Sequence, residues 1–471
     1  MTSTINTRIA YIFTVAAVLF LCGCTKDDTP PVSEEERIAL KAKKFVYDYT
    51  SEAYLWRSHI NPSIDYKSAA SPQDLFEMMR YRELDKWSYV SDNSQQEMEG
   101  FQGVSTTFGY SLAFGTFTNM PDVYFAVVMF VYDGSPAQQA RLERGDIILT
   151  LDGSTLSKGN YTQLYYASKV NIGLGEYTEE GIRETGETVS LTAVKMYEDP
   201  VVTSKVLDVN GVKVGYLFYA GFYEESHGKL VEVFTDFQAE GVKELILDLR
   251  YNPGGNANTP PYLASLFAPR NVVKERKVFL TQTWNDLYMK YFTQKGEDMN
   301  TYFVPGIPVN LNLSRVFVLT TGNTASASEA TISGLMPYMD VVKIGDSTYG
   351  KYCGAALLTP MDSNGNKDSE ISNWLLSLVV YKFVNVEGFT EFKDGIAPDC
   401  TVEDSGLLRG IPLGDGQDPM VAAALSMIGG TKVGAPAADR LPEGIRMMPE
   451  LGIRPFKGGY NVIGLNKINN Q

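Results

Sequence analysis

The stretch VFVLTTGNTASASEA, from Val316 to Ala330, decides how the central part of this chain folds. Its first four residues form an unbroken apolar run, which is typical of a buried strand. Gly322-Asn323 then turns the chain out of the sheet, and the pattern predicts a helix from about Ala327. Ser326 should therefore lie at the carboxyl edge of a parallel sheet, where α/β proteins place their functional sites.

The same strand–helix rhythm continues on both sides, from Val212 to about Val402. Val214 to Phe218 and Leu245 to Leu249 are predicted strands, with a predicted helix from Lys229 to Phe237 between them. Such βαβ units imply helices packed on a mainly parallel sheet. Pro269 to Gly306, rich in aromatic and charged residues, is interpreted as an insertion near the substrate cleft.

The rest of the chain has a different character, and we expect a multidomain α+β protein. Ser33 to about Asn93 has apolar residues at helical spacing, whereas about Gly100 to Pro200 alternates short β-rich runs with turns. The expected parts are a leader (1–23), a tether (24–32), a helical N-terminal domain (33–97), a β-rich domain (98–205), an α/β domain (206–430) and a C-terminal extension (431–471).

The composition restricts the partners of the protein. The chain has 471 residues, 44% of them hydrophobic, and a formal net charge of -15. An acidic surface repels phosphate backbones, so nucleic acid is not an expected partner.

The first two dozen residues are interpreted as an export signal. Arg8 precedes an apolar run from Ile9 to Leu21, which is too short to span a bilayer as a helix. The run ends in Leu21-Cys22-Gly23-Cys24, which resembles a bacterial lipobox and implies a lipid on Cys24. A plain signal peptide is the alternative. The lipid would anchor the protein in the cell envelope, in an outer membrane, facing the periplasm or the cell surface.

Two cysteines remain if Cys24 carries lipid and Cys22 is cleaved away. An oxidising compartment permits a disulfide between Cys353 and Cys400. Two free buried thiols are an equally acceptable interpretation.

Ser326 has both a functional and a structural interpretation. As a nucleophile, it would lie against unpaired backbone N–H groups and the positive end of a helix dipole, which can stabilise an oxyanion. Ser326-x-x-Glu329 also fits a capping box, a common helix start. This segment alone favours the cap.

Lys351 is the candidate base. It ends Tyr349-Gly350-Lys351, after a predicted strand from Val341 to Ile344. Burial would lower the pKa of a lysine enough to let it deprotonate a serine, whereas a solvated loop lysine would stay charged. The chain has only two histidines, His59 in the helical zone and His227 in a polar stretch expected to be exposed. A Ser–Lys pair is therefore the simplest activation scheme.

Several motifs together resemble the tail-specific, or C-terminal-processing, serine peptidases. Thr324-Ala325-Ser326-Ala327-Ser328-Glu329 is followed by Gly350-Lys351, with the lysine 25 residues after the serine (351 minus 326). Asp248-Leu249-Arg250-Tyr251-Asn252-Pro253-Gly254-Gly255 and Gly395-Ile396-Ala397-Pro398-Asp399 are further matches. The resemblance implies Ser326 as nucleophile and Lys351 as base. It also implies an oxyanion hole formed by the N–H of Ala327 and that of Gly254 or Gly255.

Two features depart from this family. Its frequent glutamine four residues after the lysine is replaced by Ala355, and its frequent aspartate eleven residues after the nucleophile by Pro337, with Asp340 nearby. The residue that orients Lys351 is therefore unassigned.

The β-rich domain resembles a PDZ domain, through Gly134-Ser135-Pro136-Ala137 before a predicted helix and Gly145-Asp146 before a predicted strand. The loop Gly109-Tyr110-Ser111-Leu112 would receive a peptide carboxylate on its backbone N–H groups. Tyr110-Ser111 departs from the usual Gly-Leu-Gly pattern, so peptide binding and a purely structural role both stay open.

The sequence thus predicts a serine endopeptidase that hydrolyses polypeptides near their C-termini through Ser326 and Lys351. The α/β domain would be catalytic, and no cofactor or metal is needed. The alternatives are a non-catalytic peptide-binding lipoprotein that keeps the fold, and an esterase or amidase with the same dyad.

Overall fold

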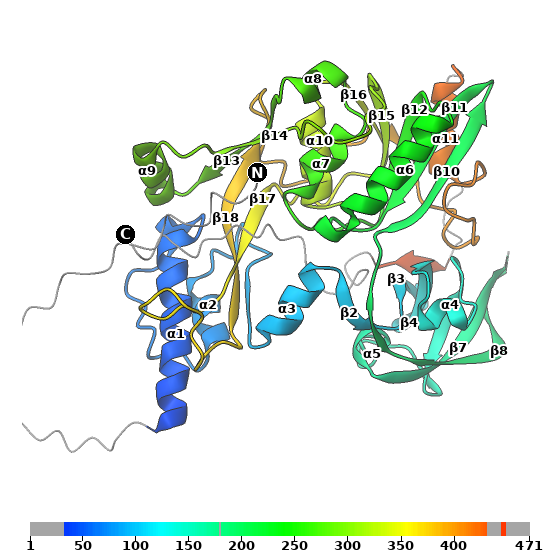
Figure 1. Cartoon of the computed structure of the whole chain (residues 1–471). Coiled ribbons are helices and arrows are strands. Elements are labelled where there is room, and N and C mark those ends of the chain that lie inside the picture. The colour runs from blue at the N-terminus through cyan, green and yellow to red at the C-terminus, as the bar shows by residue number, and fades with distance from the viewer. Residues whose placement is uncertain (1–32, 179, 431–443, 449–471) are drawn as a thin grey trace, which may run out of the picture.

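The structure is a computed structural model that describes residues 33–178, 180–430 and 444–448 (Figure 1). The expected leader, the tether and the lipidation site Cys24 lie outside these residues, and all three stay predictions. Most of the expected 431–471 extension also lies outside them. Within the described ranges, no helix is both long enough and apolar enough to cross a membrane.

The α/β domain is built on a six-stranded sheet. Its strands, in spatial order, are β10 (Val201–Val209), β11 (Val212–Tyr219), β12 (Glu244–Asp248), β15 (Arg315–Thr320), β16 (Asp340–Gly345) and β19 (Cys400–Thr401). Only β10 and β11 pair antiparallel, and the other four neighbouring pairs are parallel. The segments that follow β12, β15 and β16 therefore leave the same edge of the sheet, side by side.

Both faces of this sheet are covered because alternate side chains of its strands point to opposite sides. Leu217 belongs to one hydrophobic core, together with residues of α6 (His227–Ala239), α7 (Thr259–Ser265) and α10 (Ala327–Leu335). Tyr216 and Phe218 belong to the other core, which contains residues of α11 (Pro419–Ile428) and of the β-rich domain. The β-rich domain thus packs on one face of the sheet.

A second, five-stranded sheet joins the helical N-terminal domain to the α/β domain. Its central strand, β18 (Leu375–Val384), pairs with β17 (Cys353–Leu358), with β13 (Val278–Trp284) and with β1 (Tyr89–Ser91), and β14 (Asn300–Tyr302) pairs with β13. The expected helical zone is present as α1 (Glu34–Ala53), η1 (Arg57–His59) and α2 (Pro72–Met79). Figure 1 shows α1 in blue beside the long yellow strand β18.

The predicted insertion contributes to this second sheet. It forms α8 (Arg270–Lys274), β13, α9 (Asp286–Lys295) and β14. Cys353 lies in β17 and Cys400 in β19, on different sheets, and both are free thiols.

The β-rich domain contains the third large sheet. Its strands are β3 (Tyr110–Phe117), β4 (Met120–Val131), β5 (Ile147–Leu151), β6 (Ser154–Thr155), β7 (Lys169–Thr178), β8 (Gly181–Thr192) and β20 (Ile445–Met447). Two short helices, α4 (Pro136–Gln139) and α5 (Gln163–Tyr166), pack with it. The expected helix start is present, because the Ser135 hydroxyl accepts from the Gln138 N–H at 3.1 Å.

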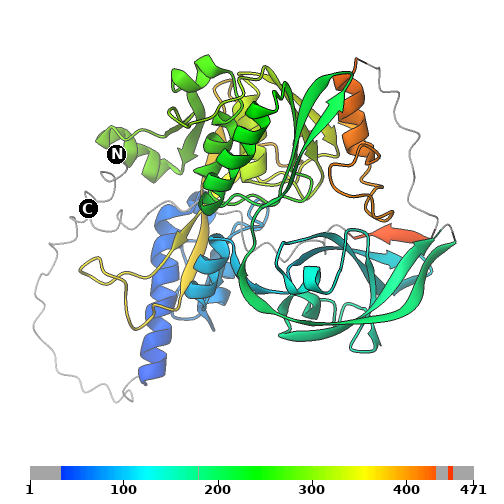
Figure 2. The same cartoon turned by 45° about the vertical axis from the view of Figure 1, so that its right-hand side comes forward.

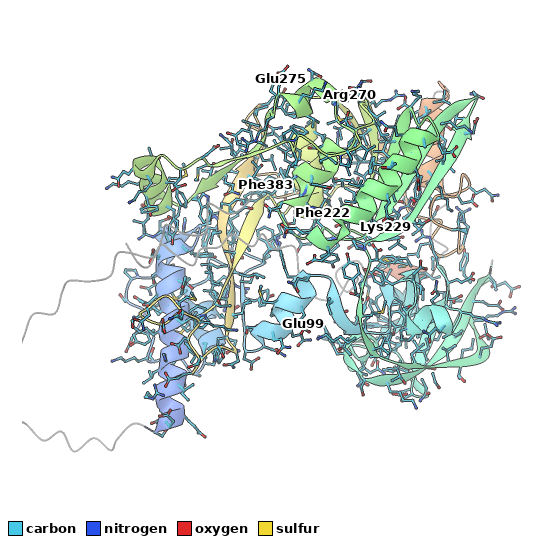
Figure 3. The ribbon with its side chains drawn as sticks, viewed as in Figure 1. Glu99, Phe222, Lys229, Arg270, Glu275 and Phe383 are labelled. Carbon is cyan, nitrogen blue, oxygen red and sulfur yellow. The ribbon has the colours of Figure 1, made fainter. Side chains whose placement is uncertain are left out.

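Two expected domain boundaries fall inside secondary-structure elements. α3 (Ser94–Phe101) spans the boundary predicted at residues 97 and 98, and β10 spans the one predicted at 205 and 206. The β-rich domain is connected to the rest of the protein by two paired strands, β2 (Val104–Thr107) and β9 (Val194–Tyr197). An ion pair of 2.8 Å between Lys195 on β9 and Glu99, labelled in Figure 3, ties α3 to this connection.

A buried network of charges lies where the β-rich domain meets the α/β domain. Arg250 is fully buried and contacts carboxylate oxygens of Asp248 (2.9 Å), Asp404 (2.9 Å) and Asp418 (2.8 Å). Arg144, from the β-rich domain, reaches the same Asp404 at 2.9 Å. Because Asp248 and Arg250 bracket the end of β12, the network fixes the turn that follows this strand.

Replacement of Arg250 by Met should strongly destabilise the protein, because it leaves buried carboxylates without their main counter-charge. We expect a loss of about 3–5 kcal/mol in the free energy of unfolding. Arg183→Met, which removes an exposed ion pair with Glu176, is the matched control and should change stability by less than about 0.5 kcal/mol. The measurement is the urea unfolding midpoint, and similar midpoints for the two variants would contradict the structural role of Arg250.

Candidate active site

Ser326 lies in a strained turn between β15 and α10. Its backbone has φ 57° and ψ -109°, a combination that residues with a side chain rarely adopt. Such strain costs on the order of 1–3 kcal/mol and is typical of functional sites. The sharp strand–helix turn resembles the one that presents a nucleophilic serine in hydrolases. The side chain is 4% exposed, at the edge of a hollow described below.

Glu329 joins the serine segment to the lysine segment. One oxygen of its buried carboxylate accepts from the backbone N–H of Ser326 (2.8 Å) and of Lys351 (2.9 Å). The other oxygen accepts from the Gly350 N–H and from the Thr348 hydroxyl, both at 2.6 Å. The Glu329 half of the expected capping box is therefore present, but its carboxylate also binds the loop after β16. The structure thus brings the backbones of Ser326 and Lys351 to the same carboxylate oxygen.

Burial dominates the titration of Glu329. It raises the pKa of this carboxyl group to about 7, although hydrogen bonds from Thr348, Gly350, Ser326 and Lys351 favour the ionised form. The carboxylate is therefore fully ionised only above neutral pH.

Lys351 is fully buried rather than a solvated loop residue. Burial lowers the pKa of its ammonium group to about 8, and the neighbouring acidic groups Cys353, Asp85 and Glu329 partly oppose this shift. A lysine with a pKa near 8 is substantially neutral in mildly alkaline solution, and neutral lysine is the form that accepts a proton.

The turn after β12 lies directly against the predicted nucleophile. A Cβ atom on Gly254 would lie 2.8 Å from the Ser326 Cβ and 2.9 Å from the Ala327 nitrogen, and its φ is +107°. Only glycine fits this approach. Gly255 forms an isolated parallel bridge with Phe222, which Figure 3 labels. Of the predicted oxyanion-hole residues, Gly254 and Ala327 therefore lie against Ser326, and Gly255 follows in the same turn.

Asn252 ties this turn to the serine segment. Its carbonyl oxygen accepts from the Ala325 N–H and from the Ser328 hydroxyl, both at 3.0 Å. Its side chain donates to the Tyr219 carbonyl at 2.8 Å and accepts from the Gly254 N–H at 2.8 Å. The sequence analysis included Asn252 in a motif but did not assign it this positioning role.

Asp85 brings the N-terminal domain into the site. This buried carboxylate accepts from the Tyr54 hydroxyl at 2.7 Å and from the N–H groups of Trp87 (2.9 Å) and Ser88 (3.0 Å). The Ser88 hydroxyl in turn accepts from the N–H of Val379 on β18 at 2.9 Å. Asp85 was not among the residues predicted from the sequence. The only local signal was an acidic residue two positions before Trp87.

Two hollows flank the serine. The smaller is mainly apolar and is lined by Ser326 and Ala327 together with side chains from α10, β13 and β18, among them Ala330, Phe279, Tyr381 and Phe383. The larger begins at Gly254 and Gly255 and extends to Tyr110 and Ser111 of β3 and to α3. The smaller hollow thus touches Ser326 itself, and the larger lies beyond the adjoining glycine turn.

Comparison with known proteins identifies the family of the chain. Residues 213–402 match the sequence profile of Peptidase family S41, and residues 41–89 match the Peptidase S41 N-terminal domain. The chain belongs to peptidase family S41. The second match includes Asp85, so the N-terminal segment that approaches Lys351 is part of the S41 architecture.

The S41 relatives are remote in sequence. A carboxyl-terminal-processing protease from Picosynechococcus is 26% identical over 65% of this chain and 68% of its own. One from Synechocystis is 25% identical over 69% of this chain and 70% of its own. The crystal structure of a candidate S41 protease from Bacteroides fragilis is 26% identical, with a TM-score of 0.68 over 82% of this chain and 97% of its own.

Neither Ala355 nor Asp340, at or near the two positions where the sequence departs from the family, supplies a polar group that could orient Lys351. Ala355 is buried in β17, opposite Val379 of β18. Asp340 starts β16 opposite Arg315, at the amino edge of the sheet, whereas Lys351 follows the carboxyl edge. Asp340 is therefore excluded as the group that orients Lys351.

His227 is not exposed, contrary to the sequence-based expectation. Its ring is half-buried, stacks on Tyr262 with centroids 3.8 Å apart, and lies 3.1 Å from the Thr259 hydroxyl. The aromatic partner lies 35 positions further along the chain (262 minus 227), which local polarity does not reveal.

Substitution of Ser326 should separate backbone strain from chemistry. Ser326→Gly relieves the positive φ, whereas Ser326→Ala keeps the strain, so the glycine variant should be about 1 kcal/mol more stable than the alanine variant. Thermal unfolding measures the difference. An alanine variant as stable as the glycine variant would contradict the strained turn.

Proposed function

We propose that this protein is a serine endopeptidase that hydrolyses polypeptides by acyl transfer through Ser326 and Lys351. The observation that carries the proposal is the Glu329 carboxylate, one oxygen of which holds the backbones of both residues. The burial of Lys351 supports its role as the base. Membership of the S41 peptidases supports the reaction class.

The reaction begins with proton transfer from the Ser326 hydroxyl to neutral Lys351. The serine oxygen attacks the peptide carbonyl carbon, and the carbonyl oxygen becomes an oxyanion bound by backbone N–H groups. The C–N bond then breaks, and protonated Lys351 gives its proton to the leaving amine. Water, deprotonated by Lys351, hydrolyses the acyl-enzyme and restores Ser326.

The two backbone N–H groups proposed to bind the oxyanion can be assigned to individual residues. Ala327 is the first residue of α10, where N–H groups have no partner within the helix. In the glycine turn, the Gly254 N–H already donates to Asn252. We therefore assign the second donor to Gly255.

The β-rich domain is proposed to act as a PDZ-like peptide-binding module. Tyr110 and Ser111 of the predicted carboxylate-binding loop line the larger hollow, which extends to the glycine turn beside Ser326. An extended chain held along β3 would thus have a continuous path toward the dyad, consistent with cleavage near a C-terminus. A lipid on Cys24 and a location in the cell envelope complete the proposal.

The first test is cleavage of unfolded casein by the soluble fragment that lacks residues 1–24, across pH 6 to 10. Activity should rise with pH through an apparent pKa near 8, because only neutral Lys351 is a base. Ser326→Ala and Lys351→Ala should each reduce kcat by at least about 1000-fold. Equal activity in all three proteins would reject the dyad.

A small ester substrate separates the alternatives. Ester turnover without casein cleavage would favour an esterase or amidase. Peptide binding without turnover of either substrate would favour a non-catalytic peptide-binding lipoprotein.

Asp85 is proposed to be a positioning residue that acts through Lys351. Its negative charge raises the pKa of Lys351, so Asp85→Asn should shift the rising limb of kcat to lower pH, by on the order of 0.5–1 unit. Asp92→Asn, at an exposed site of the same domain, is the control and should leave the limb in place. Reduced activity at every pH without a shift would indicate a merely structural Asp85.

A further inference from the structure

The outer edge of β3 is occupied by a distant part of the same chain. β20 pairs antiparallel with β3, placing Ile445, Arg446 and Met447 opposite Phe117, Thr116 and Gly115. The pairing is extended at both ends, because the Thr118 N–H donates to the Gly444 carbonyl (2.9 Å) and the Met448 N–H to the Phe114 carbonyl (2.8 Å). Figure 2 shows β20 as the red arrow along the upper rim of the β-rich domain.

This edge is the one on which a peptide would be expected to pair. The other edge of β3 is taken by β4. The predicted carboxylate-binding loop is short, because Tyr110, Ser111 and Leu112 already belong to β3. A peptide whose carboxylate bound near Gly109, just before β3, would run antiparallel to β3, as β20 does. Residues 444–448, which we call the strap, therefore have the position and direction of a bound peptide.

The side chains of the strap fasten it on two sides. Ile445 is buried in the core between the β-rich domain and the α/β sheet, which also contains Met420 and Val421 of α11. Met448 is buried in the core of the β-rich domain itself, with Phe114 and Leu112. The strap thus binds like a ligand with two apolar anchors.

The first residues of β3 do not pair with the strap. The Leu112 N–H donates to the Tyr165 hydroxyl (3.1 Å), which donates back to the Leu112 carbonyl (3.2 Å). Tyr110, Ser111 and Tyr165 line the hollow that extends to Gly254. The first half of β3 thus borders the hollow, with the Tyr165 hydroxyl on the backbone groups of Leu112, whereas the strap covers the second half.

We propose that the strap is an internal occupant of the peptide-binding edge of β3, and that a polypeptide substrate must displace it to pair along the whole strand. This inference rests on the proposed role of the β-rich domain in peptide binding. Tethering gives the strap an effective concentration in the millimolar range, so it competes strongly with free peptide. Long unfolded chains, which can replace its backbone pairing and both anchors, would be favoured over short peptides.

The test weakens the pairing of the strap with β3 by a single substitution. Gly444, Arg446 and Met448 share one side of an antiparallel strand, so the Arg446 N–H faces β3. Arg446→Pro removes this N–H, and Arg446→Ala keeps it as the matched control. The probe is a fluorescein-labelled peptide PEGIRMMPE, the sequence of residues 442–450. Binding is measured with the full chain in a Ser326→Ala background, so that cleavage does not interfere.

The proline variant should bind the probe at least about tenfold more tightly than the alanine control, because the competing strap is released. A second variant is designed to hold the strap on β3 instead of releasing it. Thr116→Cys with Arg446→Cys joins register partners, and its oxidised form should not bind the probe until it is reduced. Equal binding by the proline variant, the alanine control and the oxidised lock, or no binding by any of them, would overturn the proposal.

The proposed enzymatic function is judged separately. With Ser326 restored, Arg446→Pro should lower the KM for unfolded casein relative to Arg446→Ala. If the probe discriminates between the variants but casein is not cleaved, the strap inference stands and the peptidase proposal fails. If casein is cleaved and the probe binds all variants equally, the strap inference fails alone.

Discussion

The Glu329 carboxylate is the constraint on which the site depends. It accepts hydrogen bonds from the start of α10 and from the loop after β16, and so holds Ser326 and Lys351 in one buried place. A short polar side chain could cap the helix alone. The longer Glu side chain both caps the helix and crosses to the neighbouring loop. Because the carboxyl group is buried, its pKa is raised to about 7, and it is fully ionised only above neutral pH.

The strain at Ser326 is tolerated because its surroundings are held from several directions. Asn252 binds both the glycine turn and the serine segment, while Arg250 anchors the same turn between the buried carboxylates of Asp248 and Asp418 and the partly buried Asp404. These interactions stabilise the turn independently of Ser326, so the positive φ persists in the folded protein. Removal of any one side chain leaves buried polar groups without partners, which is costly in a dry interior.

The site is assembled from more than the α/β domain. Asp85, from the N-terminal domain, acts on the electrostatics of Lys351 because β1 joins the same sheet as β17. The β-rich domain supplies the far wall of the larger hollow and the edge of β3. The residues of the candidate site and the walls of its hollows thus come from three domains that share hydrophobic cores.

The sequence by itself determined the strand–helix alternation of the α/β domain and the place of Ser326 directly after a strand, because strand periodicity and glycine turns are local signals. The roles of Gly254 and Gly255 were implied only by the resemblance of their motif to a peptidase family. The sequence also indicated the helix starts after Ser135 and Ser326. Only the tertiary structure decided the burial of Lys351, the second role of Glu329, the approach of Asp85 and the pairing of residues 444–448 with β3. These features join segments far apart in the chain, and local sequence patterns carry no information about which distant segments meet.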